Sequence, residues 1–240
     1  MPQSNVLWPA GASPSGPAMI PWIELDRTEL PDGGVLRLMR RGREFSIKLG
    51  VAELMTSRQF GSEEALATLT AAKLAKRARP RVLIGGLGMG FTLRAALSAF
   101  GAESEIVVAE LVPAVVRWAR GPMAEMFAGC LEDARVELAM TDVAALIRAG
   151  GAYDAILLDV DNGPEGMTQA ANDGLYSPRG LAAARAALRP HGVLAVWSQG
   201  PDRAFALRFQ KAGFAVEDKR VRAGGSHGGT RHVIWLGMRT

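Results

Sequence analysis

Three closely spaced glycines mark the part of this chain that is best suited to chemistry. Gly86, Gly88 and Gly90 follow the apolar run RVLIG (81–85) directly and precede the helix-like run FTLRAALSAF (91–100). Glycines between a strand and a helix allow a tight turn and let a ligand approach the backbone closely, with the helix N-terminus behind it. Such a turn can also need glycine for steric reasons alone, so the three glycines indicate a ligand site only in combination with other residues.

Acidic residues follow the predicted strands. Glu110 ends the next strand, twenty residues after Gly90, where a carboxylate can accept hydrogen bonds from both ribose hydroxyls of a nucleoside. Asp142 follows the third strand, and Asp159 closes the fourth, with Asp161 close behind. Ligands bind outside the carboxyl ends of the strands in an open parallel sheet, so these four groups are expected to face one crevice.

Two interpretations of these carboxylates stay open. They can stand at the entry of helices, which applies to Glu110 and most directly to Asp142, because a helix is predicted to follow it. Alternatively, they line an acidic crevice that attracts a cation such as a sulfonium or an amine. The charge distribution fits the second view: between Glu103 and Asp173 the chain has thirteen acidic and four basic residues, whereas residues 201–240 have eight basic and three acidic residues.

The elements that must position these residues alternate between strand and helix. Short strands that are apolar nearly throughout and separated by helices indicate a parallel sheet covered on both faces. The predicted strands are 81–85, 105–110, 135–140, 153–159 and 192–198, and the predicted helices are 62–79, 91–100, 113–127, 142–149, 178–189 and 202–212. Two further runs, 214–221 and 231–238, predict a closing antiparallel hairpin.

The chain before this α/β pattern divides into two parts. Residues 1–21 hold five prolines without periodicity, which predicts a poorly ordered tail. Residues 22–60 are expected to form a small β-hairpin unit, because short apolar stretches broken by glycine run from about Val35 to Met55. Residues 61–240 are then the α/β domain.

Composition excludes several classes of protein. The chain has 240 residues, 48% of them hydrophobic and 22% charged, which is typical of a globular protein and excludes disordered and fibrous classes. A single cysteine, Cys130, and three histidines exclude a disulfide scaffold and a zinc module, so no metal is expected. The net charge is +4, but the basic clusters lack interleaved aromatic residues, so no nucleic-acid partner is expected. No apolar run is long enough for a bilayer span, and we expect a cytoplasmic protein without a membrane partner.

Longer stretches of the sequence resemble the spermidine synthase (polyamine aminopropyltransferase) family. VLIGGLGMGFTLR (82–94) is similar to the family's glycine-rich motif, and YDAILLDVDNGPEG (153–166) with GLYS (174–177) resembles its Asp-rich loop and helix entry. LGVAELMTSRQFGSEEAL (49–66) looks like the family's hairpin-to-helix segment, and the similarity covers roughly residues 35–198. The resemblance implies a class I S-adenosylmethionine-dependent methyltransferase fold with a seven-stranded, mostly parallel sheet and an N-terminal β-hairpin unit.

The resemblance also implies roles for single residues. The family transfers an aminopropyl group from decarboxylated S-adenosylmethionine to an amine. In this chain the glycine loop would line the donor site, Glu110 would hold the ribose, and Asp142 with Val143 would contact adenine. Asp159 stands at the place of the catalytic aspartate, with Asp161 beside it in the same loop. A carboxylate next to an attacking amine can accept its proton.

Some positions depart from the family's pattern. Met89 stands where the family's glycine loop has an aspartate that holds the donor's amine, although it remains a donor-site position. In the implied acceptor site, Glu53 stands in place of the family's glutamine, and Ser62 and Glu63 stand in place of its tyrosine and the following His/Gln. Asn162 of the Asp-rich loop and Tyr176 of the helix entry complete the predicted acceptor site.

These observations predict a transferase. The first hypothesis is a spermidine synthase-like enzyme that takes S-adenosylmethionine or its decarboxylated form as co-substrate and transfers an aminopropyl-type group to a small cationic amine. Because Met89 cannot pair with an ammonium, a methyltransferase that uses intact S-adenosylmethionine is the alternative. A non-catalytic nucleoside-binding homologue is the third hypothesis. Relatives in this family are commonly dimers, so a homodimer is expected.

Overall fold

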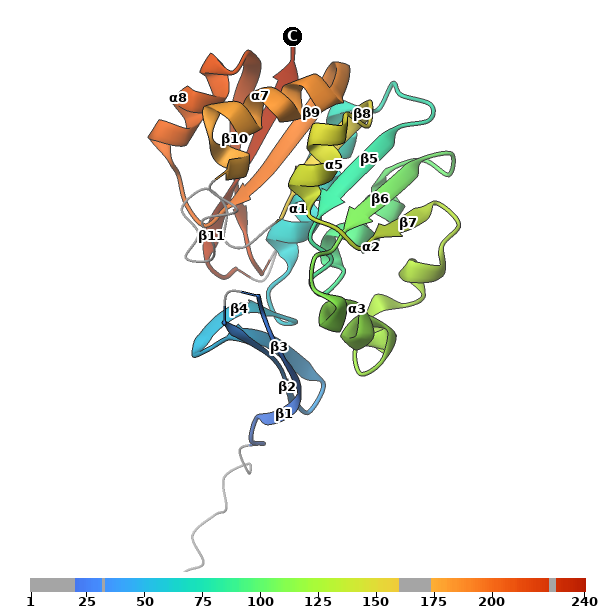
Figure 1. The fold of residues 1–240 in the computed structure, drawn as a ribbon, viewed down its shortest axis with the longest axis vertical. Helices are drawn as coiled ribbons and strands as arrows, with labels where there is room; N and C mark the ends of the chain where they lie inside the picture. The colour runs from blue at the N-terminus through green and yellow to red at the C-terminus, as the bar shows by residue number, and fades with distance from the viewer. Residues whose placement is uncertain (1–19, 32, 160–173, 225–227) are drawn as a thin grey trace, which may run out of the picture.

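The computed structural model describes residues 20–31, 33–159, 174–224 and 228–240 (Figure 1). The residues described form two β-sheets and the helices that cover the larger sheet. Figure 1 shows the smaller, N-terminal sheet (blue) beside the end of the larger sheet at which the central strands finish. No described helix has both the length and the apolar character needed to cross a bilayer.

The N-terminal sheet is antiparallel and has the strand order β1-β2-β3-β4. Its strands are β1 (Ile23–Glu29), β2 (Val35–Arg41), β3 (Glu44–Leu49) and β4 (Ala52–Thr56). The predicted hairpins correspond to β2, β3 and β4, whereas β1 was missed. β1 is a largely exposed edge strand with a mixed polar sequence, so it carries no regular apolar alternation. Asp26 on this strand accepts a 2.7 Å hydrogen bond from Trp118 Nε1, which ties the small sheet to the larger unit.

The larger sheet has seven strands in the order β10-β11-β9-β8-β5-β6-β7. All neighbouring pairs are parallel except those that involve β11, which runs antiparallel to β9 and β10. The strands are β5 (Arg81–Gly85), β6 (Glu105–Ala109), β7 (Val136–Ala139), β8 (Tyr153–Leu158), β9 (Leu188–Ser198), β10 (Phe214–Arg222) and β11 (Arg231–Arg239). The predicted α/β fold class with a seven-stranded, mostly parallel sheet is confirmed.

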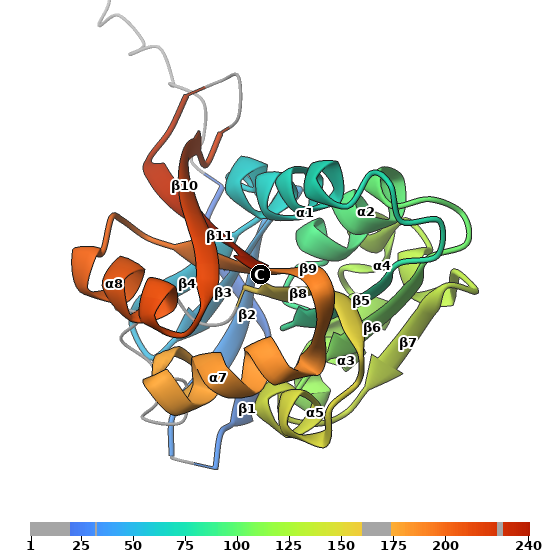
Figure 2. The same ribbon diagram turned by 90° about the horizontal axis from the view of Figure 1, so that it is seen from above.

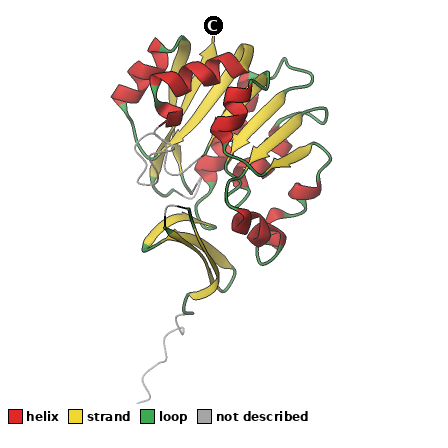
Figure 3. Ribbon diagram, viewed as in Figure 1, coloured by secondary structure: helices red, strands yellow, loops and turns green. Residues whose placement is uncertain are grey.

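Helices cover both faces of this sheet (Figures 2 and 3). They are α1 (Gly61–Lys73), α2 (Phe91–Ala99), α3 (Pro113–Arg120), α4 (Ala124–Phe127), α5 (Val143–Ala149), α7 (Pro178–Ala187) and α8 (Arg203–Lys211), with a 3₁₀ helix at Cys130–Glu132. One hydrophobic cluster packs α1, α2 and α3 against the first face and also takes in residues of β2 and β3. A second cluster packs α5, α7 and α8 against the other face.

Two predicted helices differ from the structure. The helix expected over 62–79 ends at Lys73, because the basic residues that follow are mostly exposed and have no apolar face to bury. The helix expected over 113–127 is divided into α3 and α4. Gly121 ends α3, and Pro122, which lacks a backbone N–H and cannot continue a helix, follows it.

Candidate functional site

The candidate site lies at the carboxyl end of β5, where the strand order reverses. The chain continues from β5 to β6 on one side and reaches β8 on the other. Gly85, the last residue of β5, pairs with Ala109 of β6 and with Leu158 of β8. The residues that follow these partners, Glu110 and Asp159, therefore flank the start of the glycine loop, and a crevice at such a reversal is the usual ligand site of open α/β sheets.

The three loop glycines are needed by the fold itself. Gly86, Gly88 and Gly90 have φ angles of +89°, +50° and +78°, a region that favours glycine. A Cβ atom at Gly88 would lie 2.8 Å from Met55 Cε, and one at Gly90 would lie 2.5 Å from Phe127 Cε1. Steric need thus explains Gly88 and Gly90 without a ligand, and the contact with Met55 brings β4 of the small sheet against the loop.

Met89 lies inside the fold. Its side chain is 1% exposed and belongs to the hydrophobic cluster that packs α1 and α2 against the sheet. The sequence placed this residue at the donor site, where the resembled family has an aspartate. In the structure its side chain packs in the core, so Met89 contributes its backbone, and not its side chain, to the surface of the glycine loop.

Glu110 holds the glycine loop through its carboxylate. Oε2 accepts a 2.9 Å hydrogen bond from the Leu87 amide and Oε1 accepts a 2.8 Å hydrogen bond from the Val112 amide. The side chain is buried, and this burial raises its pKa, although hydrogen bonds from backbone amides of both loops oppose the rise. A carboxylate oxygen can accept more than one hydrogen bond, so Glu110 can hold the loop and still receive ribose hydroxyls.

Asp142 is the N-cap of α5, as one of the two interpretations of the sequence proposed. Its Oδ1 accepts a 2.9 Å hydrogen bond from the Ala144 amide. Val143 is buried and packs against the end of β5: a Cβ atom at Gly85 would lie 3.0 Å from Val143 Cγ2. Both residues therefore fix the start of α5 beside the glycine loop.

Two exposed apolar side chains lie next to these groups and were not singled out from the sequence. Leu111, directly after Glu110, is 58% exposed, and Met140, directly after β7, is 50% exposed. Because β6 and β7 are neighbouring parallel strands, the two residues stand at the same edge of the sheet. Exposed large apolar side chains at a strand end provide a surface for a flat apolar ring such as a nucleobase. Leu111 directly follows Glu110 and Met140 lies two residues before Asp142, and this nearness to acidic residues was the only signal in the sequence.

Asp159 is held by a threonine that sequence reasoning missed. Thr92, the second residue of α2, donates a 2.8 Å hydrogen bond from Oγ1 to Asp159 Oδ2. The same hydroxyl lies 3.4 Å from the main-chain oxygen of Glu63, in the first turn of α1. Thr92 thus brings together the end of β8, the start of α2 and the start of α1, and the sequence offered no signal for this contact beyond its place just after the glycine loop.

Glu63 carries the most strongly altered ionisation of the candidate acceptor-site residues. Burial, and then the charge of Asp159, raise the pKa of Glu63 to about 7, whereas a hydrogen bond from Ser62 acts in the opposite direction. That bond joins Ser62 Oγ to Glu63 Oε2 at 2.6 Å, and Ser62 itself is 1% exposed. The carboxyl groups of Glu63 and Asp159 are therefore close enough to influence each other's charge, and the assignment of Ser62 and Glu63 to an acceptor site stays a prediction.

The stability of the protein is expected to depend on this carboxyl. Because the pKa of Glu63 is raised on folding, its ionisation opposes folding progressively between about pH 4.5 and pH 7. Replacing it with an uncharged amide, Glu63→Gln, is expected to stabilise the protein by roughly 1–3 kcal/mol at pH 8 and by much less at pH 4.5. Thermal melting at both pH values measures the difference. Glu125→Gln, the same chemical change on an exposed residue of α4, is the control, and a Glu63→Gln effect that does not change with pH would contradict the expectation.

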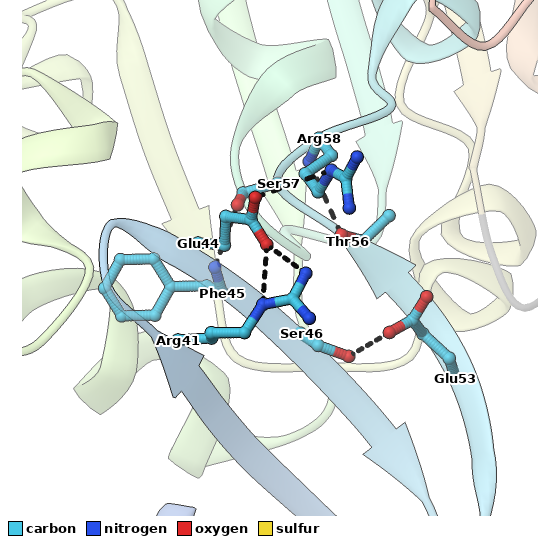
Figure 4. Close-up of polar contacts among 8 residues, drawn as sticks. All are labelled: Arg41, Glu44, Phe45, Ser46, Glu53, Thr56, Ser57 and Arg58. Atoms are coloured by element: carbon cyan, nitrogen blue, oxygen red, sulfur yellow. Dashed lines mark hydrogen bonds and ion pairs between the residues drawn. The ribbon is translucent and has the colours of Figure 1, made fainter. Parts of the chain in front are cut away.

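Glu53 lies on the small sheet (Figure 4). Its Oε2 accepts a 2.6 Å hydrogen bond from Ser46 Oγ on the neighbouring strand β3. Nearby, Arg41 donates to Glu44 Oε2 through Nε and Nη2, at 3.1 and 2.7 Å. The hydrogen-bond partner of Glu53 is thus a residue of its own sheet. Glu53 precedes by two residues Met55, and the Met55 side chain reaches the glycine loop.

The remaining predicted residues divide into two groups. Tyr176 is 3% exposed, and its ring packs edge-on against Phe205 in the second hydrophobic cluster, on the face that α7 and α8 cover. The part of Tyr176 in the acceptor site therefore stays a prediction. Asp161 and Asn162 lie outside the described residues. Among the described residues, no group of three or more His, Cys, Asp or Glu side chains is arranged to hold a metal ion.

Comparison with known proteins supports the resemblance. Polyamine aminopropyltransferases of Mycobacterium tuberculosis (strains CDC 1551 / Oshkosh and ATCC 25618 / H37Rv) and Mycobacterium bovis are each 32% identical to the chain over 124 residues. These residues are 50% of this chain and 23% of each relative, so the match spans less than a quarter of the relatives' length. No protein-family model matches the chain.

Solved structures of spermidine synthases share the fold. The Thermotoga maritima spermidine synthase superposes with a TM-score of 0.72 at 19% identity, over 90% of this chain and 73% of that one. A spermidine synthase in complex with the transition-state analogue AdoDATO gives 0.71 at 18% identity, over 90% and 72%. A probable spermidine synthase from Corynebacterium glutamicum gives 0.60 at 13% identity, over 90% and 80%. The predicted likeness to spermidine synthases and their methyltransferase-like fold is confirmed.

Proposed function

We propose that this protein binds a nucleoside sulfonium donor at the carboxyl end of β5 and transfers an aminopropyl-type group from it to a small amine. The observation that carries the proposal is the placement of Glu110 and Asp159 on the two sides of the glycine loop. Gly86 N donates to Ala109 O at 2.9 Å and Asp159 N donates to Gly85 O at 3.3 Å, so the end of β6 is bonded to the first loop glycine and Asp159 to the last residue of β5. One carboxylate is then available to the donor's ribose and the other to the reacting amine.

The donor would lie across the ends of β5, β6 and β7. The backbone of the glycine loop would border its central part, and the Glu110 carboxylate would accept hydrogen bonds from the ribose hydroxyls. The adenine ring would lie against Leu111 and Met140, with the start of α5 at Asp142 and Val143 beside it. These positions supply polar acceptors for the sugar and apolar surface for the base, as a nucleoside requires.

Asp159 would act on the acceptor amine. The nitrogen lone pair attacks the carbon next to the sulfonium, a C–N bond forms, and the C–S bond breaks with its electron pair remaining on sulfur. The product is a neutral thioether, methylthioadenosine when the donor is decarboxylated S-adenosylmethionine. The attacking nitrogen becomes positively charged and loses its proton to the Asp159 carboxylate. Thr92 would orient this carboxylate, because its hydroxyl already donates to Oδ2.

Methyl transfer from intact S-adenosylmethionine is the second candidate function. The observation that favours it is the apolar, buried Met89, which gives the donor's tail no carboxylate at this position. A donor that bears its own carboxylate would then be repelled less. The same crevice and the same acidic residues would serve either reaction.

A cytoplasmic location and a homodimer stay predictions.

Titration of the purified protein with three nucleosides tests the proposal. We expect decarboxylated S-adenosylmethionine and methylthioadenosine to bind, because both carry the nucleoside that the crevice suits, and the decarboxylated donor to bind more tightly than intact S-adenosylmethionine. Isothermal calorimetry measures all three affinities under one set of conditions. Tighter binding of intact S-adenosylmethionine would support the methyltransferase candidate. Binding of none of the three would reduce the glycine loop to a structural turn and refute the proposal.

A further inference from the structure

We infer that the outer edge of β10 is a docking site for an extended segment of a partner protein, which adds to the sheet as a further strand and carries acidic side chains next to an apolar one. The inference is independent of the proposed function, because β11, β9 and β8 separate β10 from the crevice at the end of β5. It adds a surface for protein association and the chemistry of the partner that this surface fits.

The backbone of β10 is paired on one side. Its nine residues pair with β11 along their whole length, from Phe214 opposite Arg239 to Arg222 opposite Arg231. In an antiparallel pair, every second residue directs its amide and carbonyl groups away from the partner strand. Among the described residues, no backbone group outside β11 forms a hydrogen bond with the backbone of residues 214–222, and five of these nine residues are exposed. Such an edge is a template for another strand.

Basic side chains border this edge on both faces of the sheet. Lys219 lies opposite Ile234, which belongs to the hydrophobic cluster on the α1 face. Arg220 lies opposite Val233, which belongs to the cluster on the other face. Of the two acidic residues of β10, Glu217 forms an ion pair with Lys219 at 3.9 Å and a second ion pair at 2.7 Å with the last residue of α1. The charge that the edge offers to a neighbouring strand is therefore mainly positive.

Three arginines at the carboxyl half of this edge lack a counter-charge. Arg222 lies directly opposite Arg231, and Arg220 precedes Arg222 by two residues on the same face. Like charges directly opposite each other destabilise a strand pair. Within the part of the chain that the structure describes, no acidic side chain forms an ion pair with any of the three. Carboxylates of an added strand would supply that charge, whereas the basic β10 edge of a second copy would be repelled.

An apolar cavity lies at the other half of the same strand. Its volume is about 340 Å³, and strands β9, β10 and β11 supply its apolar lining: Val193, Val216, Leu236 and Met238. The cavity adjoins the amino half of β10, and Val216 precedes Arg220 by four residues, which is roughly 13 Å along a strand. In strand addition, main-chain hydrogen bonds provide affinity and pockets for alternate side chains provide specificity. One apolar side chain in the cavity and acidic side chains beside the arginines would thus define the partner segment.

Synthetic peptides test the inference. Two fluorescein-labelled peptides of nine residues would alternate threonine with valine in one half and threonine with glutamate in the other half, in the two possible orders. Fluorescence anisotropy with the full-length protein measures their affinities. We expect one order to bind at least tenfold more tightly than the same peptide with lysine in place of glutamate, and added salt to weaken this binding. N-methylation of every second peptide amide is expected to abolish binding in one frame and to preserve it in the other, because only one set of amides faces β10.

A charge-reversal variant tests the role of the arginines. Arg222→Glu is expected to bind the glutamate peptide about tenfold more weakly, because the change removes one attraction and adds one repulsion. Its melting temperature is expected to equal or exceed that of the wild type, because an acidic side chain at this position lies opposite Arg231. Arg120→Glu, the same change on an exposed residue of α3, is the control and is expected to bind the peptide as the wild type does.

Several results would overturn the inference. Failure of both glutamate peptides to bind would do so, as would equal affinity for the glutamate and lysine peptides. N-methylation without effect in either frame would show that no strand is added, and wild-type binding by Arg222→Glu would remove the arginines from the site. If size-exclusion chromatography showed an oligomer that Arg222→Glu dissociates, the edge would serve contact between copies of this chain in place of a different partner.

Discussion

Replacing Asp159 with asparagine is expected to lower product formation by about 10²- to 10⁴-fold, the usual contribution of a positioned proton acceptor. Asparagine keeps the shape of the side chain and can still accept the Thr92 hydroxyl hydrogen bond that now measures 2.8 Å. It cannot accept the proton that the attacking amine releases. Donor binding is expected to stay nearly intact, because the donor lies toward Glu110 and Asp159 faces the amine. Methylthioadenosine calorimetry and a product assay together separate binding from turnover.

The control for this variant is Asp218→Asn, the same chemical change on an exposed residue of strand β10. It is expected to leave both turnover and binding as in the wild type. If Asp159→Asn lost methylthioadenosine binding and retained turnover, the two carboxylates would have been assigned the wrong roles. If Asp159→Asn retained full turnover and binding, Asp159 would serve only to anchor the start of α2 through Thr92.

Replacing Glu110 with alanine is expected to abolish detectable donor binding. The variant loses the acceptor of the ribose hydroxyls, and hydrogen bonds to a charged group contribute about 1.5–3 kcal/mol each, so two such bonds correspond to at least 10²-fold in affinity. It also deprives the amides of Leu87 and Val112 of the oxygens that now accept their hydrogen bonds at 2.9 and 2.8 Å. Each unsatisfied buried amide costs about 1–3 kcal/mol of stability, so a lower melting temperature is expected as well.

Glu110→Gln separates the two effects. Its amide oxygen can still accept one backbone hydrogen bond, so the melting temperature is expected to fall less than in the alanine variant, while the weaker binding of methylthioadenosine persists. Glu105→Gln, an exposed carboxyl at the start of the same strand, is the matched control. Donor binding by Glu110→Gln at wild-type affinity would mean that Glu110 only holds the loop in place and does not contact the ribose.

The dual role of Glu110 illustrates how the fold and the site depend on the same residues. The glycine loop is held by Glu110 from one side, by the packing of Met55 and Phe127 against Gly88 and Gly90, and by Val143 against Gly85. A loop so constrained presents its backbone in one conformation, which lowers the entropic cost of binding a ligand. Substitutions here are therefore expected to change stability and binding together.

The sequence by itself determined the features that depend on local order along the chain. Alternating apolar strands and helices predicted the parallel sheet, and the rule that ligands bind at the carboxyl ends of strands placed Glu110 and Asp159 at one edge. The turn after RVLIG needed glycine because of its backbone conformation, a property of neighbouring residues. The break between α3 and α4 was also visible in Gly121 and Pro122, although the helix was predicted to continue. β1 was not predictable in this way, because an exposed edge strand is stabilised by its pairing with β2.

Only the tertiary structure decided which way the side chains of the loops face and what surrounds them. Alignment with the resembled motif put Met89 at the donor, but its side chain packs in the core and is 1% exposed. Glu63 and Asp159, far apart in the sequence, meet because α1 and β8 are both joined to Thr92. The pKa of Glu63 rises because burial and a neighbouring charge disfavour its ionised form, and both depend on residues that only folding brings together.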